Sequence, residues 1–276
     1  MKVLNGLELA GFIKERQAHE VRGLRQAHGI RPKLAIVATI DHPAIEVYMR
    51  MKARYGDDIL VEVETHRVVQ SEASALIQKL NTDDSVHGII VQLPLEDPSG
   101  TEEIVNLVAP EKDVDALGAH ATLDPATPLA ILWLLAGYNV DLAGKKIVLV
   151  GRGKLVGAPL ERMLLASGND VTVVDRKTPD AATIIREADV IVTATGTPGL
   201  VKSDMIKEGA VVVDAGVAGE QGKTVGDLAD DVYERQDLTI TPRKGGVGPL
   251  TICALFENVI RAARATTASP VRHAGA

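Results

Sequence analysis

The chain has 276 residues, of which 46% are hydrophobic and 24% charged, a composition typical of one large or two modest soluble globular domains. Its formal net charge of −7 argues against a nucleic-acid binder, which would need a basic surface. The single cysteine, Cys253, excludes an internal disulfide and any metal site built from several thiolates. Aromatic residues make up only 3%, so we expect a core of Val, Ile, Leu and Ala, as in parallel α/β sheets.

The N-terminal stretch contains no apolar signal-peptide core, because Lys2, Glu8 and Lys14 interrupt it. The longest uncharged stretch, residues 125–140, is shorter than a membrane span and contains two prolines. We therefore expect a cytoplasmic protein, or one of the soluble interior of an organelle, with neither a membrane nor a nucleic acid as partner.

The first half of the chain alternates between helical and strand patterns. Apolar spacing and turn residues predict helices at about 8–28, 43–55 and 71–80, and strands at 33–39, 60–69 and 87–93. Pro43 fits the first turn of its helix and Gly56 its end. After an opening helix, this order predicts a βαβαβ unit.

The second half repeats the alternation after a loop-rich region with a short helix at 101–108. We expect helices at 129–137, 157–166 and 250–265, and strands at 145–150, 171–174, 190–194 and 210–214. The predicted fold class is α/β, with two α/β domains and a cleft between them. We assign residues 1–118 and 248–276 to the first domain and residues 119–247 to a second, Rossmann-like domain.

A glycine motif follows the strand at 145–150 and opens the helix at 157–166. Gly151, Gly153 and Gly157 have the spacing GxGxxxG, a variant of the dinucleotide-binding fingerprint. In such a loop the first two glycines let the backbone approach a pyrophosphate at the helix N-terminus. Since strand, loop and helix occur in the required order, we predict that this loop binds a dinucleotide.

The residues after the next strand bear on the choice of cofactor. Asp175 stands where an acidic residue binds the ribose hydroxyl of NAD, whereas Arg176 and Arg152 would favour the 2′-phosphate of NADP. We favour NADP slightly and keep NAD open. Thr195 and Gly196 follow the third strand of this domain and either leave room for the nicotinamide half or form a plain turn.

Four residues of the first half are candidates for chemistry. Tyr48 and Lys52 lie four residues apart, on one face of the predicted helix. Gln92 ends a strand, at the carboxyl edge where sites in α/β sheets gather, and Asp115 lies in a later loop. Taken singly, each also fits a structural or solvated role. The histidines show no metal-ligand spacing, so we predict no metal.

Taken together, these segments resemble the bifunctional methylenetetrahydrofolate dehydrogenase/cyclohydrolase family. The matching segments occur in family order over nearly the whole chain: residues 47–52 (VYMRMK), 87–95 (HGIIVQLPL), 110–115 (PEKDVD), 151–159 (GRGKLVGAP) and 245–251 (GGVGPLT). VQLPL and GGVGP are the specific runs. The resemblance implies a homodimer that binds tetrahydrofolate derivatives.

The resemblance also implies a role for each matching residue. Lys52 would be the catalytic lysine and Gln92 the residue that positions it. Tyr48 would stack on the folate, Asp115 would hold the pterin ring, and Gly246 and Pro249 would contact the substrate. Arg152 would serve the cofactor loop. The implied reaction passes a hydride from methylenetetrahydrofolate to a nicotinamide and hydrolyses the methenyl product to 10-formyltetrahydrofolate.

Several positions depart from the family pattern. The family has Gly at Ala116, Ser at Gly153, and His-Ser at Asp175 and Arg176. Pro-Val-Pro is replaced by residues 242–244 (PRK). Two alternatives therefore stay open: a dehydrogenase with a weakened cyclohydrolase or an altered substrate, and a catalytically silent dinucleotide-binding regulator.

Overall fold

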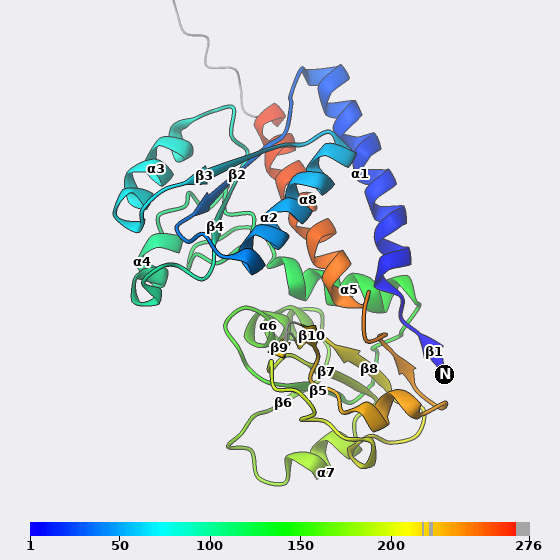
Figure 1. Cartoon of the computed structure of the whole chain (residues 1–276). Coiled ribbons are helices and arrows are strands. Elements are labelled where there is room, and N and C mark those ends of the chain that lie inside the picture. The colour runs from blue at the N-terminus through cyan, green and yellow to red at the C-terminus, as the bar shows by residue number, and fades with distance from the viewer. Residues whose placement is uncertain (217, 221–222, 269–276) are drawn as a thin grey trace, which may run out of the picture. The chain divides into compact units, whose positions relative to one another are not determined.

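The computed structural model describes residues 1–216, 218–220 and 223–268. The chain forms two compact units, each with its own parallel sheet (Figure 1). The glycine-loop unit consists of Met1–Gly11 and Thr127–Thr251, and the Lys52 unit of Phe12–Ala126 and the chain from Ile252 onward. The predicted α/β class with two parallel-sheet units is confirmed.

The Lys52 unit contains a three-stranded parallel sheet in the order β3-β2-β4, formed by β2 (Lys33–Ala38), β3 (Glu62–Arg67) and β4 (Gly88–Gln92). The central strand β2 pairs with both neighbours, so that Ala38 lies opposite Arg67 on one side and Gln92 on the other. The helices between and after these strands are α2 (Pro43–Ile59), α3 (Gln70–Thr82) and α4 (Thr101–Val105), with a 3-10 turn at Pro98–Gly100. The predicted βαβαβ order is confirmed.

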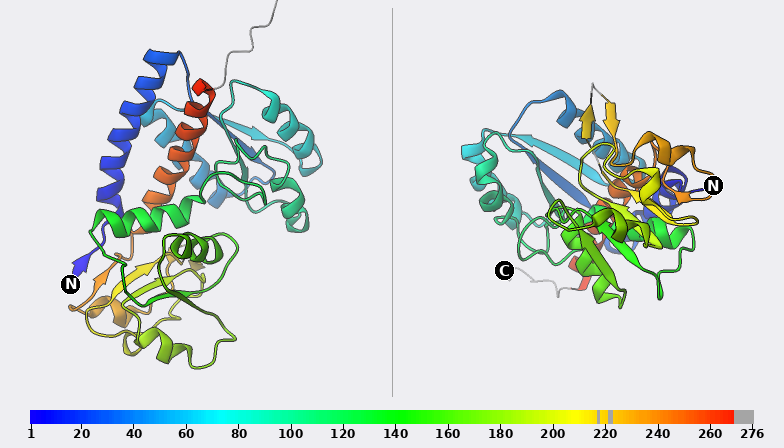
Figure 2. Two further views of the ribbon diagram at one scale, coloured as in Figure 1. Left: turned by 180° about the vertical axis from the view of Figure 1, so that it is seen from behind. Right: turned by 90° about the horizontal axis from the view of Figure 1, so that it is seen from below.

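Two long helices complete the Lys52 unit. They are the part of α1 (Gly6–His28) from Phe12 onward and the part of α8 (Val247–Ala265) from Ile252 onward, followed by a 3-10 turn at Thr266–Ala268. These helices run side by side in both figures (Figures 1 and 2). Ion pairs of 2.8 Å from Arg16 to Glu257 and 2.9 Å from Arg264 to Glu20 join them.

Helix α2 extends beyond its predicted end. The sequence places that end at Gly56, but the helix continues to Ile59. Gly56 is buried, and a Cβ there would lie 2.5 Å from Cγ2 of Val63 and 2.8 Å from the carbonyl oxygen of Val61. Gly56 therefore permits close packing of α2 against β3 and does not end the helix. The predicted end was wrong because glycine more often stands just after the last residue of a helix.

The glycine-loop unit contains a six-stranded parallel sheet in the order β1-β11-β8-β7-β5-β6. Its strands are β1 (Lys2–Val3), β5 (Ile147–Val150), β6 (Val171–Val174), β7 (Val190–Thr193), β8 (Val211–Asp214) and β11 (Thr239–Ile240). An antiparallel pair joins β9 (Ala218–Glu220) and β10 (Lys223–Val225). The helices are α5 (Ala126–Gly137), which starts one residue before the unit, α6 (Gly157–Ala166) and α7 (Ala181–Arg186), with 3-10 turns at Ser203–Met205 and Asp230–Glu234.

The boundaries between the units fall after Gly11, Ala126 and Thr251. The boundaries between the sequence-based domains fall after residues 118 and 247. The N-terminus belongs to the glycine-loop unit because β1 pairs in parallel with β11, with Lys2 opposite Thr239. Residues 269–276, assigned from sequence to the first domain, lie outside the described residues. In the described part of the chain, no helix is both long and apolar enough to cross a membrane.

Candidate active site

Lys52 lies on α2, and its ammonium group reaches the end of β4. Its Nζ donates a hydrogen bond of 2.8 Å to Oε1 of Gln92. The amide nitrogen of Gln92 donates to the carbonyl of Leu93 at 2.9 Å, which turns the amide oxygen toward the lysine. Gln92 is the last residue of β4, at the carboxyl edge of the sheet where sites in α/β proteins gather.

Asp115 lies in a loop whose conformation is stabilised by contacts of the preceding residues Lys112 and Asp113. An isolated bridge pairs Asp113 with Ile89 on β4, and the Asp113 carboxylate accepts the backbone N–H of Gly118 at 2.8 Å. Lys112 donates to the carbonyls of Leu80 and Asp83, at 3.1 and 2.8 Å. Asp113 therefore holds the loop, which leaves Asp115 as the carboxylate next to Lys52.

Burial sets the charges of this pair. Burial lowers the pKa of the Lys52 ammonium, and the nearby Asp115 carboxylate opposes this shift only in part. Burial raises the pKa of Asp115, and the Lys52 charge opposes that shift only in part. The site therefore holds an amine that gives up its proton more readily than an ordinary lysine, the property that a proton-transferring group needs near neutral pH.

Tyr48 lies one helical turn before Lys52 on α2, and 48% of its surface is exposed. Val47 and Met51 are exposed to 47% and 45% on the same helix. This stretch of α2 thus presents an aromatic ring and two apolar side chains to solvent beside the lysine. The structure brings Lys52, Gln92 and Asp115 together in the Lys52 unit, while Gly246 and Pro249 belong to the glycine-loop unit.

The glycine loop has the backbone that a dinucleotide requires. Gly151 has φ +100°, a conformation that side chains rarely allow, and a Cβ on Gly157 would lie 2.1 Å from the Gly151 carbonyl oxygen. Gly153 is exposed, and a Cβ there would meet only Ala194, at 4.0 Å. Helix α6 starts at Gly157, and no side chain caps its N-terminus. The Ala158 N–H donates to the Gly153 carbonyl oxygen at 3.1 Å, and Pro159 has no N–H. The N–H of Gly157, at the helix start, suits a phosphate.

Two of the charged residues around this loop, Arg152 and Asp175, already form ion pairs or hydrogen bonds within the protein. Arg152 pairs with Glu161 on α6 at 2.7 Å. The Asp175 carboxylate accepts the backbone N–H of Lys177 at 2.8 Å and the hydroxyl of Thr178 at 3.1 Å, so it forms a turn after β6. Arg176 is exposed.

Asp227 holds the turn after β7 that contains the predicted cofactor contacts Thr195 and Gly196, and no sequence motif predicts it. Its buried carboxylate accepts the backbone N–H of Thr195 at 2.7 Å and of Thr197 at 2.8 Å, and thereby fixes the turn that contains Gly196. Burial and the neighbouring Asp214 raise the pKa of Asp227. No motif marks this residue; the only signal is Gly216, where a Cβ would lie 2.2 Å from the Asp227 carboxylate.

Within the described residues, no group of three or more His, Cys, Asp or Glu side chains is arranged to hold a metal ion. The described residues combine a lysine whose pKa burial lowers, beside an apolar helix face, with a glycine loop on a Rossmann-like sheet. These features define an NAD(P)-binding α/β enzyme with a second, lysine-bearing α/β unit.

Two family models match the chain. They are the tetrahydrofolate dehydrogenase/cyclohydrolase catalytic domain over residues 4–115 and the NAD(P)-binding domain of the same family over residues 125–267. The chain therefore belongs to the tetrahydrofolate dehydrogenase/cyclohydrolase family, as the sequence resemblance predicted.

Full-length relatives agree with this assignment. The chain is 39% identical over 279 residues to the bifunctional protein FolD of Campylobacter jejuni, with 96% of this chain and 99% of the relative covered. The crystal structure of a Campylobacter jejuni FolD matches with a TM-score of 0.90 at 37% identity, covering 96% and 99% of the two chains. The Trypanosoma brucei FolD, solved with NADP and an inhibitor, matches with a TM-score of 0.89 at 31% identity, covering 97% and 98%.

Proposed function

We propose that this chain oxidises 5,10-methylenetetrahydrofolate with NADP and then hydrolyses the 5,10-methenyl product to 10-formyltetrahydrofolate. In this proposal the Lys52 unit binds the folate and the glycine-loop unit binds the nucleotide. The observation that carries it is the Lys52 amine, whose pKa burial lowers and which is bonded at 2.8 Å to a neutral amide beside Asp115, in a member of this family.

The first reaction, oxidation of methylenetetrahydrofolate, needs little acid–base catalysis from the protein. A nicotinamide cofactor supplies the hydride acceptor when bound. Loss of the hydride leaves a cation shared by two folate nitrogens, so this step depends mainly on alignment. In the proposal, Gly151, Gly153 and Gly157 bind the pyrophosphate, and Asp227 holds the turn of Thr195 and Gly196 beside the nucleotide.

The second reaction needs proton transfers. Water adds to the cationic carbon and loses a proton. The carbon–N5 bond then breaks while N5 gains a proton, and the added hydroxyl releases its own proton to solvent as it becomes the carbonyl. A neutral Lys52 amine takes the proton from the attacking water, and the resulting ammonium is an acid for N5. Gln92 orients the amine without adding a charge that would raise its pKa.

The remaining side chains hold the substrate. Asp115 accepts hydrogen bonds from the pterin amino group and ring nitrogen. The exposed ring of Tyr48 stacks on the folate, next to the apolar Val47 and Met51. The family resemblance supports Gly246 and Pro249 as further substrate contacts.

NADP is the cofactor that we favour. The Asp175 carboxylate already accepts two hydrogen bonds within its own turn, whereas the exposed Arg176 suits a 2′-phosphate. The Trypanosoma brucei relative was solved with NADP. A comparison of kcat/KM for NADP and NAD checks this choice, and a higher value for NAD would contradict it.

The activity assay mixes purified protein with methylenetetrahydrofolate and either cofactor, and follows both the reduced nicotinamide and the methenyl chromophore. We expect the reduced cofactor to form and the methenyl signal to decay faster than it does without protein. A methenyl product that persists would leave only a dehydrogenase. Absence of turnover with both cofactors would reject the folate reaction and leave the silent dinucleotide-binding regulator.

We also propose a homodimer that acts in the cytoplasm. The support for the dimer is the family resemblance, and the support for the cytoplasm is the sequence-based expectation. Light scattering of the purified protein tests the first: a particle mass of 29.3 kDa, that of one chain, would reject the dimer. Cell fractionation tests the second.

A further inference from the structure

Helix α8 contacts both sides of the Lys52 site through buried polar groups that the proposed mechanism does not use. One set of contacts leads to α2, which carries Lys52. The other leads to the loop that carries Asp115. All of these groups belong to the Lys52 unit.

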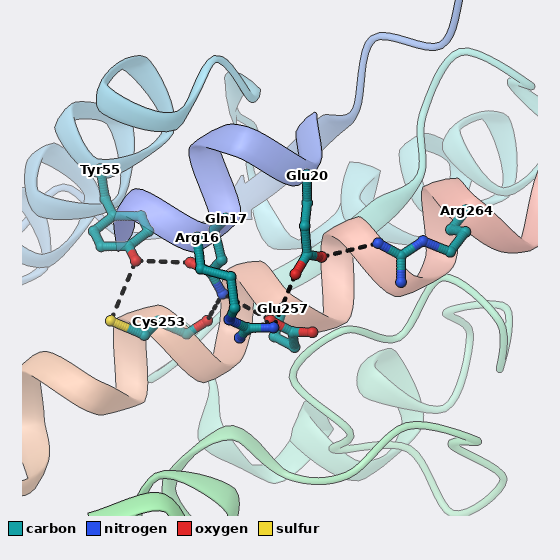
Figure 3. A network of polar contacts seen from close by, with 7 residues as sticks. All are labelled: Arg16, Gln17, Glu20, Tyr55, Cys253, Glu257 and Arg264. Carbon is teal, nitrogen blue, oxygen red and sulfur yellow. Dashed lines mark hydrogen bonds and ion pairs between the residues drawn. The ribbon is translucent and has the colours of Figure 1, made fainter. Parts of the chain in front are cut away.

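The first set of contacts centres on Tyr55, which lies on α2 three residues after Lys52 (Figure 3). Its hydroxyl lies 2.7 Å from Oε1 of Gln17 on α1 and 3.2 Å from Sγ of Cys253 on α8. Its ring packs on Phe256 with a centroid distance of 5.0 Å. Burial raises the pKa of Tyr55, so its hydroxyl remains a donor.

Gln17 closes this cluster. Its side chain is fully buried, and Nε2 donates to the Cys253 carbonyl at 2.8 Å and to Oε2 of Glu257 at 3.1 Å. Three helices therefore meet at one buried amide, and Tyr55 is the member from α2 (Figure 3). Since buried polar groups are costly to leave unpaired, this arrangement fixes the rotation and the axial position of α2.

The second set of contacts centres on Asn258, which is also fully buried on α8. Its Nδ2 donates to the carbonyl of Val114 at 2.9 Å and to the carbonyl of Asp124 at 2.8 Å. Val114 directly precedes Asp115. The Oδ1 atom of Asn258 is buried with no hydrogen-bond partner in the described part of the chain, so this amide bears a desolvation cost while its two N–H groups hold the loop.

The two sets of contacts leave α8 in different directions. At 3.6 residues per turn, Asn258 lies about 140° around the helix from Cys253, the residue that contacts Tyr55 on α2. One rigid helix thus reaches α2 with one face and the Asp115 loop with another. We propose that α8 sets the spacing between Lys52 and Asp115, with Tyr55 and Asn258 as positioning residues for the folate reaction; this inference rests on the proposed function.

The test compares Tyr55→Phe, Asn258→Leu and a matched control, Arg264→Gln. Arg264 belongs to the exposed end of the Figure 3 network, where it pairs with Glu20 at 2.9 Å. Among the described residues, no hydrogen bond or ion pair joins its side chain to α2 or to the Asp115 loop. Thermal unfolding of each variant first establishes the folded fraction. Hydrolysis of methenyltetrahydrofolate and oxidation of methylenetetrahydrofolate are then measured separately, because they depend differently on Lys52.

We expect Tyr55→Phe to lower kcat for hydrolysis by about 10- to 100-fold, because displacements near 1 Å have such effects, with a much smaller loss in the oxidation. The rising limb of its hydrolysis pH profile should move to higher pH as water reaches Lys52. Asn258→Leu should raise KM for the folate about tenfold or more in both reactions, since Asp115 binds substrate. Arg264→Gln should match the wild type.

Equal losses in both reactions and in all kinetic constants, in proportion to the folded fraction, would overturn the inference, as would unchanged kinetics in both variants. A readout without substrate separates this inference from the proposed function. NMR titration of the Lys52 side chain should show a higher pKa in Tyr55→Phe than in the wild type, whether or not the protein turns over folate. An unchanged Lys52 titration would overturn the role of Tyr55.

Discussion

Nζ of Lys52 lies 2.8 Å from Oε1 of Gln92, so the lysine in the centre of the site has a neutral partner within hydrogen-bonding distance. Asp115 is the charged group that raises the Lys52 pKa, and it does not outweigh burial. In the proposed hydrolysis Lys52 must lose its proton near neutral pH. Its partner is an amide, which orients the amine without adding a charge that would raise its pKa.

Gln92→Glu should reverse this advantage. A carboxylate at the same position stabilises the ammonium form, so the pKa of Lys52 rises and the amine is protonated at pH 7. We expect hydrolysis of methenyltetrahydrofolate to fall about tenfold or more at pH 7 and to recover at higher pH. The exposed Gln236→Glu, which adds the same charge on the other unit, is the control. A Gln92→Glu profile that overlays the wild type would contradict the role of the neutral partner.

Lys52→Met keeps an unbranched chain and removes the proton carrier. Hydrolysis should fall by about 10²- to 10⁴-fold, the usual contribution of general acid–base catalysis. Binding of the folate should remain measurable by fluorescence or calorimetry, because Tyr48 and Asp115 are intact. Unaffected hydrolysis would refute the role that we assign to Lys52.

Asp115→Asn should shift the pH profile in the direction opposite to Gln92→Glu. The Asp115 charge raises the Lys52 pKa, so its removal lowers that pKa further, and the rising limb of kcat for hydrolysis moves to lower pH. The same change weakens pterin binding, so KM for the folate should rise. The measurement is kcat at saturating folate across the pH range; a limb that moves to higher pH would show that the two charges do not interact as described.

Much of this site is predictable from sequence because glycine and proline residues mark where its helices begin. Helix α6 has the predicted bounds, since the glycine loop opens it. Lys52 and Gln92 are 40 residues apart in the sequence and form a hydrogen bond. Both are candidates from sequence because Lys52 lies four residues after Tyr48 on one helix face and Gln92 ends a strand at the carboxyl edge of the sheet.

Other parts carry no local signal. Strands β1 and β11 have two residues each, too short for any periodicity, and their pairing depends on the whole sheet. Asp227 acts through backbone N–H groups some 30 residues away, which no spacing rule reveals. Asp113 and Asp115 look alike in sequence, and only the folded loop shows that the first is structural.

Ala116 is a departure from the family that the backbone explains. The family has Gly there, and Ala116 adopts φ +54°, in the left-handed region that favours glycine. We expect Ala116→Gly to stabilise the protein by about 0.5–1 kcal/mol through relief of this strain. Urea unfolding measures the change. Ala18→Gly, in the interior of α1, should have the opposite sign and cost about 1 kcal/mol; two variants of the same sign would contradict the account.

Asp227→Asn tests the turn of Thr195 and Gly196, which we propose lies beside the nucleotide. An amide can accept only one of the two N–H groups, from Thr195 and Thr197, that the carboxylate now accepts at 2.7 and 2.8 Å. Loss of one charge-assisted hydrogen bond should raise KM for the nicotinamide cofactor by about tenfold. Hydrolysis of preformed methenyltetrahydrofolate consumes no nucleotide, so it should proceed at the wild-type rate and serves as the internal control.

The stability of the wild type relative to Asp227→Asn should also depend on pH in a defined direction. Burial and Asp214 raise the pKa of Asp227 above its ordinary 3.8, so the folded protein holds this proton more tightly than the unfolded chain does. Wild-type stability from this group is therefore fully present below 3.8 and is lost as pH rises through the folded value. Relative to Asp227→Asn, the wild type should lose thermal stability between about pH 4 and neutrality; a difference that grows in the wild type's favour over this range would show that the carboxylate is stabilised in its charged form.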